Sequence, residues 1–144
     1  MKVIKQPHQK KYMKTNMKIQ KLFFGKDNCL KINLTDNKEC FFEFGKSIEK
    51  KENENKEEKQ KWFWKTIKFS DIELGEIIDI LEKNEGSKSF FHNFKGEKTQ
   101  IWIKKNQEYF NIKIKEVNKG LSRGEQIVFR ELLKKIILEI STKK

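Results

Sequence analysis

One order of elements occurs twice along this sequence, and it limits the possible folds more than any other feature. In each half, several strand-like segments precede a helix that opens with Ser-x-x-Glu, at Ser70 and Glu73 and again at Ser122 and Glu125. In such a capping box the two side chains satisfy free backbone amides at the helix start. The repeat predicts one α+β domain built from two similar strand-then-helix units, related by a pseudo-two-fold axis.

Strand-like segments fill most of both halves. The segment 30–34 alternates apolar Leu30, Ile32 and Leu34 with polar residues, which is the period of a strand with one buried face. By similar criteria we expect strands at 17–24, 30–34, 39–45 and 61–69 in the first half and at 87–94, 99–105 and 109–117 in the second, with room for a fourth at 117–121. Both helices carry apolar residues at helical spacing.

Positive charge dominates the composition. The 144 residues include 33 Lys and Arg against 21 Asp and Glu, a formal net charge of +12. A field of this sign attracts polyanions, so nucleic acid or an anionic membrane surface leads the possible partners. A Lys-rich composition is also what an AT-rich genome produces without any partner.

The charges are unevenly distributed along the chain. The first 26 residues contain lysines but no acidic residue, and we expect residues 1–16 to form a disordered basic arm. Residues 46–60 have mixed charge and low complexity, which predicts a mobile loop. One folded domain is therefore expected over residues 17–141.

The two cysteines, Cys29 and Cys40, lie in apolar strand-like segments. This placement is typical of buried free thiols in a reducing compartment. No stretch reaches the roughly 18 consecutive apolar residues of a membrane span, and the N-terminus lacks the apolar core of a secretory signal. We expect an intracellular protein, cytoplasmic or on the nucleoid, without a membrane partner; organelle import stays open, although the basic start lacks Arg and Ser.

Aromatic and basic residues alternate on the predicted strand 61–69. Trp62, Trp64 and Lys68 share one face, whereas the opposite face is apolar and suits the core. Rings that stack bases, beside lysines that neutralise phosphates, are what binding a single strand without reading its sequence requires. Similar reasoning gives a candidate set of Lys21, Phe23, Lys31, Phe41, Lys61, Trp62, Trp64, Lys65, Lys68, Trp102, Lys104, Lys113 and Lys115. The alternative for each tryptophan is a place in the core or in a subunit interface.

The sequence shows no catalytic motif. His92 follows Phe90 and Phe91, which we assign to the core together with Phe129, and a lone histidine there is typical of a structural hydrogen bond. The histidines and cysteines lack metal-ligand spacing, and neither a Walker-type glycine loop nor a nucleophile elbow occurs. We expect no enzyme activity, metal or cofactor; a metal-dependent nuclease built on carboxylates is the remaining enzymatic alternative.

Three segments resemble the Whirly proteins. The run 73–75 reads ELG in the first helix, the run 89–92 reads SFFH in the next strand, and the tail 120–138 looks like the Whirly C-terminal helix. In element order the resemblance covers roughly residues 17–140. It implies a Whirly-like duplicated ββββα fold, in which two antiparallel four-stranded sheets pack with two helices, shared with PUR, PC4-like and archaeal ThermoDBP-type proteins.

The resemblance also implies a function and an assembly state. It implies binding of single-stranded DNA with little sequence preference, by a homo-oligomer that is a tetramer in Whirly proteins and a dimer in several relatives. The Lys-Gly-Lys-Ala-Ala-Leu motif that supports higher assembly in Whirly proteins has no counterpart, since residues 29–34 read CLKINL.

Charge, aromatic residues and resemblance together predict a passive single-stranded DNA-binding protein. An RNA-binding protein or RNA chaperone is the first alternative, because a sheet that stacks bases need not distinguish the two sugars. The second is an oligomeric protein-interaction module, in which the exposed aromatic residues form an interface and the lysines maintain solubility.

Overall fold

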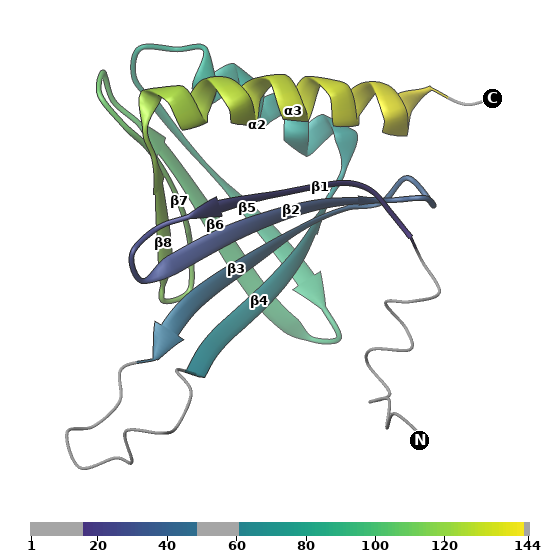
Figure 1. The fold of residues 1–144 in the computed structure, drawn as a ribbon, viewed down its shortest axis with the longest axis horizontal. Coiled ribbons are helices and arrows are strands. Elements are labelled where there is room, and N and C mark those ends of the chain that lie inside the picture. Colours follow the sequence, from purple (N-terminus) through teal and green to yellow (C-terminus); the bar gives the residue numbers. More distant parts are fainter. Residues whose placement is uncertain (1–15, 49–60, 143–144) are drawn as a thin grey trace, which may run out of the picture.

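The computed structural model describes residues 16–48 and 61–142. Within them the chain forms eight strands and two helices (Figure 1). In chain order these are β1 (Met17–Phe24), β2 (Asn28–Thr35), β3 (Cys40–Ile48), β4 (Lys61–Phe69), α2 (Asp71–Leu81), β5 (Gly86–Phe94), β6 (Glu97–Lys105), β7 (Phe110–Ile114), β8 (Val117–Leu121) and α3 (Arg123–Ser141).

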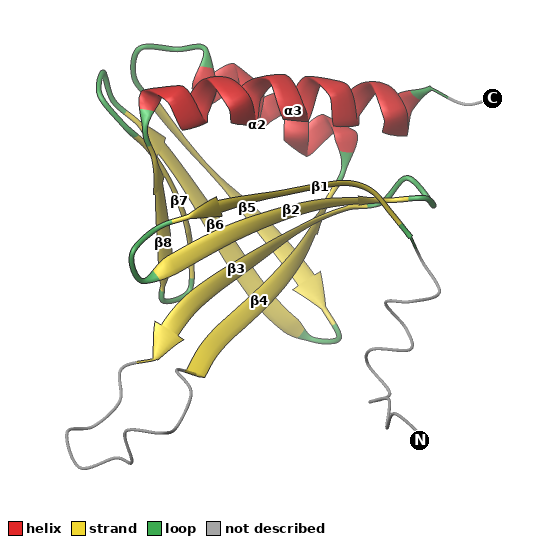
Figure 2. Cartoon of the chain, in the orientation of Figure 1, coloured by secondary structure: helices red, strands yellow, loops and turns green. Residues whose placement is uncertain are grey.

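The strands form two antiparallel four-stranded sheets. Their orders are β1-β2-β3-β4 and β5-β6-β7-β8, so each half is a meander followed by its helix. Figure 2 shows the sheets crossing each other, with both helices along one end of the molecule. The predicted duplicated ββββα fold is confirmed. The fourth strand of the second half, which the sequence allowed at 117–121, is β8.

Both predicted capping boxes are present. The Ser70 amide donates to Glu73 Oε1 at 2.9 Å, and the Glu73 amide donates back to Ser70 Oγ at 3.2 Å. The Ser122 amide donates to Glu125 Oε1 at 2.9 Å in the same arrangement. Of the helices in the described part of the chain, neither is long and apolar enough to span a membrane.

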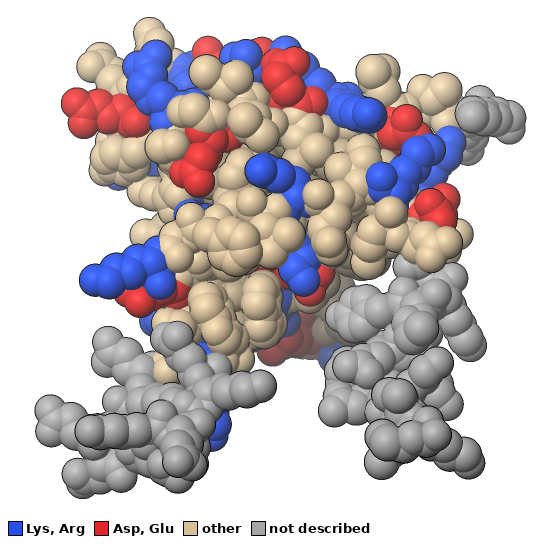
Figure 3. Space-filling view, viewed as in Figure 1, with Lys and Arg blue, Asp and Glu red and all other residues tan. Residues whose placement is uncertain are grey.

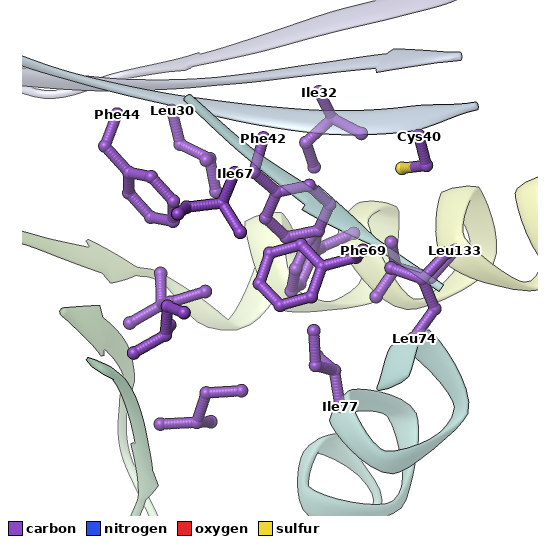
Figure 4. Close-up of a cluster of buried hydrophobic side chains, with 14 of the residues drawn as sticks. Leu30, Ile32, Cys40, Phe42, Phe44, Ile67, Phe69, Leu74, Ile77 and Leu133 are labelled. Atoms are coloured by element: carbon purple, nitrogen blue, oxygen red, sulfur yellow. The ribbon is translucent and has the colours of Figure 1, made fainter. Parts of the chain in front are cut away.

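Aromatic rings join the two halves in one core (Figure 4). The Phe42 ring of the first sheet lies 4.6 Å from that of Phe69 and 5.9 Å from that of Phe129 on α3. Phe129 also meets Phe110 of the second sheet at 5.9 Å. Such ring pairs contribute about 0.5–1.5 kcal/mol beyond the area they bury, so they hold the sheets at a defined angle beneath the helices.

Two predictions about phenylalanines are wrong. Phe23, a candidate for nucleic-acid contact, is only 3% exposed and packs edge-to-face on Phe129 at 5.9 Å. Phe91, assigned to the core, is 69% exposed. Consecutive strand residues point to opposite faces, so only one ring of each Phe-Phe pair can be buried. Phe23 and Phe90 point inward, whereas Phe24 and Phe91 point outward.

The third strand is longer than predicted. Lys46, Ser47 and Ile48 pair with the first three residues of β4, so the expected loop does not begin at residue 46. The rest of that loop, 49–60, and residues 1–15 of the expected arm lie outside the described residues.

Both cysteines are buried and free. Burial raises the pKa of the Cys40 thiol to about 12. It also raises the pKa of Cys29, where Lys31 and Lys119 act in the opposite direction. Neither thiol therefore supplies a reactive thiolate near neutral pH.

Candidate nucleic-acid interface

Two tryptophans lie side by side on the outer face of the first sheet. Trp62 and Trp64 are 38% and 43% exposed, and their rings stack with centroids 5.9 Å apart and planes 26° apart. On the other side of the same strand Ile67 and Phe69 are buried, as the alternation predicts. The pair is thus held by the sheet and open to solvent.

The Trp64 ring packs closely against the neighbouring strand. Its register partner on β3 is Gly45, and a Cβ atom built there would lie 2.7 Å from the indole ring. The Lys31 ammonium lies 5.5 Å from the centroid of the same ring, within cation–π range. Phe24, 69% exposed, belongs to the same cross-strand row. We call the surface formed by Phe24, Lys31, Trp62 and Trp64 the tryptophan face.

A polar ladder forms the border of the tryptophan face. The Gln20 amide donates to Asn33 Oδ1 at 2.9 Å, and the Asn33 amide donates to the Glu43 carboxylate. Asn33 is 2% exposed. Because these groups bond one another, they hold the strands in register and offer few free donors to a ligand.

The second sheet has a comparable outer face. Trp102 is 43% exposed, and the Lys113 ammonium lies 5.9 Å from its ring centroid. Lys104 and Phe91 are exposed on the same side, whereas Ile103 beside them is buried. We call the surface of Phe91, Trp102, Lys104 and Lys113 the second face. Trp102, Lys104 and Lys113 of the candidate set lie together here.

Three candidate lysines are already paired with carboxylates. Lys65 and Lys115 approach the Glu97 carboxylate at 2.9 and 3.1 Å, and these hydrogen bonds lower the pKa of Glu97. Lys68 pairs with Glu39 at 2.8 Å. These carboxylates neutralise part of the charge that the three lysines could offer to a phosphate.

Three candidate lysines from the first sheet lie away from the tryptophan face. Lys61 and Lys65 have the opposite strand parity to Trp62 and Trp64. The exposed Lys21 lies with its ammonium 5.5 Å from the ring of the buried Phe23. These lysines contribute to the positive electrostatic potential around the sheets rather than to the tryptophan face.

A cleft of about 400 Å³ between the two sheets joins candidates that the sequence did not connect. It runs between β4 and the β5–β6 hairpin and is lined by Phe41, Lys65, Thr66, Ile67, Lys68, His92, Asn93, Phe94 and Thr99. Phe94 is 71% exposed and was missed as a candidate. The strand alternation does not reveal this cleft, because it arises only where the two halves meet.

His92 has a structural role at this cleft. Its Nε2 lies 2.7 Å from Glu73 Oε2, and its ring meets Phe69 edge-on at 5.4 Å. Glu73 therefore joins the start of α2 to β5. Among residues 16–48 and 61–142, no three His, Cys, Asp or Glu side chains are grouped to hold a metal ion.

Charged side chains surround a largely uncharged area on the face shown in Figure 3. In the view of Figure 3, uncharged side chains occupy most of the area over β2–β4, and Lys and Arg gather around this area and along the helices. This distribution suits a ligand with a charged backbone and flat apolar groups.

The fold is shared with solved structures. The plant transcriptional regulator PBF-2, a Whirly-family protein, aligns with a TM-score of 0.58 over 85% of this chain and 82% of that chain, at 10% sequence identity. At this identity the likeness shows a common Whirly-like fold alone. Neither a protein-family model nor a curated protein matches the sequence.

Proposed function

We propose that this protein binds single-stranded nucleic acid, DNA in preference to RNA, with little sequence preference. The stacked, exposed pair Trp62 and Trp64 beside Lys31 is the observation that carries the proposal. Both requirements of such binding, flat rings for bases and cations for phosphates, occur together there. The fold shared with a transcriptional regulator supports the same class of partner.

The tryptophan face has the energetic capacity for this role. A stacked base contributes about 1–3 kcal/mol, and every base offers a face for stacking. A strand that stacks on Trp64 passes close to Lys31, whose ammonium is positioned to meet a phosphate. Since ring faces do not read base edges, this mode of binding gives little sequence preference.

The second face extends the proposed site. It repeats the combination of a tryptophan and a lysine with Trp102 and Lys113. Because the two tryptophan-bearing surfaces lie on the outer sides of different sheets, we propose that they hold separate segments of one strand or two strands. The protein acts as a binder without catalysis, and RNA is the alternative ligand.

The test is a comparison of tryptophan variants by fluorescence anisotropy with a labelled mixed-sequence oligonucleotide. Trp62→Leu with Trp64→Leu is expected to lower affinity by about 1–3 kcal/mol per stacked base, about 5- to 150-fold for each. Trp102→Leu reports on the second face. Tyr109→Leu is the matched control, because Tyr109 is 46% exposed but lies in the turn before β7, outside both faces.

Equal affinity in the double variant and in the Tyr109→Leu control would contradict the proposal.

The same variants also test the second candidate function, that of a protein-interaction module. Exposed apolar residues on α3, Ile127 and Leu138 at 55% and 66%, favour self-association as a homo-oligomer. If light scattering shows that the tryptophan variants lose assembly while oligonucleotide affinity is unchanged, the tryptophans form a subunit interface instead.

A further inference from the structure

A basic pocket of about 460 Å³ lies on the opposite side of β6 from the second face, where α2 ends and α3 begins. Its lining residues are Leu81, Asn84, Lys105, Gln107, Arg123, Gln126, Ile127 and Arg130. Three of these are cations and three are amides. None of the described residues in the lining is a carboxylate.

The cations converge from two elements. Arg123 and Arg130 project from α3 two turns apart, on one face of the helix. Lys105 ends β6 and donates a hydrogen bond to the Leu81 carbonyl at the end of α2. Burial, Arg123 and Arg130 all lower the pKa of Lys105, which reflects how close the three charges lie.

This positive charge is only partly compensated. Within the described residues, neither Lys105 nor Arg123 forms a salt bridge, and Arg130 pairs only with its neighbour Glu131, at 3.1 Å. A concave site with several cations and amide donors has the chemistry of an oxyanion site, and the planar guanidinium matches phosphate oxygens in particular.

We propose that the basic pocket binds a phosphate group. The phosphate comes either from the end of a nucleic-acid strand or from a free phosphorylated compound. Lys105 is the last residue of β6 and has the opposite strand parity to Lys104, so a strand bound on the second face reaches the pocket by passing around this end of β6. The site does not depend on base stacking, and it stands even if the tryptophans do not bind nucleic acid.

The test is a titration of the isotope-labelled full chain with inorganic phosphate, followed by amide NMR at constant ionic strength. Saturable shifts are expected at Leu81, Asn84 and Gln107. Arg123→Gln with Arg130→Gln should weaken phosphate binding at least about tenfold, because two charge-assisted hydrogen bonds are lost. The control, Lys134→Gln with Lys135→Gln, removes the same charge from α3 outside the pocket and should leave the binding curve unchanged.

Shifts that never saturate, or equal weakening in both double variants, would overturn the proposal. Undisturbed amide signals away from the pocket show that each variant is folded, and Arg123→Gln alone is the milder second variant. Oligonucleotides with and without a 5′-phosphate then separate the two sources. If the 5′-phosphate raises oligonucleotide affinity, and the Arg123→Gln and Arg130→Gln changes remove this increase, the ligand is a strand end. If inorganic phosphate binds saturably but the 5′-phosphate does not raise oligonucleotide affinity, the ligand is a free compound.

Discussion

Trp64 can pack this closely on its sheet only because residue 45 has no side chain. We predict that Gly45→Ala displaces the ring, since the added Cβ would lie within 2.9 Å of three indole carbons. Affinity for a single strand should fall about three- to tenfold, less than for loss of a stacked base, and tryptophan emission should shift. Gly75→Ala is the control, because nothing lies within 4 Å of a Cβ there. Unchanged emission and affinity in Gly45→Ala would show that ring placement does not matter.

In the proposed complex, Glu97 competes with phosphate for two lysines. Lys65 and Lys115 hydrogen-bond its carboxylate and lower its pKa, so the carboxylate is ionised at neutral pH. We predict that Glu97→Gln raises affinity and steepens the salt dependence by up to about −0.7 in log–log slope per released lysine. Glu116→Gln, with the same change in net charge, should have the smaller effect. Equal effects in titrations at several salt concentrations would mean that only net charge counts.

Strand alternation predicts single residues well where one face is clearly apolar. It placed Trp62 and Trp64 outward and Ile67 inward, as the structure has them. The same alternation allows only one buried ring in each Phe-Phe pair. The predictions for Phe23 and Phe91 are wrong because they do not follow this alternation.

Among the elements, the two helix caps provide matched tests of stability. We predict that Ser70→Ala and Ser122→Ala each lower the free energy of unfolding by about 1 kcal/mol, because each removes the side-chain acceptor at a helix start. Urea denaturation measures this loss. Single-strand affinity of the folded Ser70→Ala variant should stay unchanged, since Ser70 lies outside the tryptophan-bearing surfaces and the basic pocket. A parallel loss of affinity would show that the helix ends take part in binding.

Local signals predicted the elements because each is encoded by neighbouring residues. The capping boxes start both helices at the predicted serines, and β4 spans the predicted residues 61–69. The end of β3 was predicted too early. Lys46 and Ser47 are polar and Ile48 has no apolar neighbour, so residues 46–48 show no strand pattern of their own. They are extended because they pair with β4, and this pairing cannot be recognised from residues 46–48 alone.

For the whole molecule, the charge of +12 predicts binding that weakens steeply with salt. Each phosphate contact to a single strand contributes about −0.7 to the log–log slope. We predict that deleting residues 1–15, which carry five lysines and no acidic residue, lowers both affinity and slope without abolishing binding. Anisotropy titrations at several salt concentrations measure both. Total loss of binding on deletion would place the main site in those residues instead of on the sheets.

The cleft and the basic pocket form only where the two halves of the chain meet, so they could not be predicted from the sequence. The cleft near Phe94 and the basic pocket around Lys105 each join residues far apart in the chain. Their lining residues are common types without distinctive spacing. Only the angle between the sheets and the position of α3 bring them together.

The most direct test of single-strand binding is a competition experiment with tryptophan emission recorded in parallel. A labelled oligonucleotide bound to the protein is competed by equal lengths of single-stranded DNA, single-stranded RNA and duplex DNA. Base stacking on the tryptophans predicts that single-stranded DNA competes far better than duplex DNA and that binding quenches the emission. Equal competition by all three without quenching would contradict it, because the positive charge alone would then account for the binding.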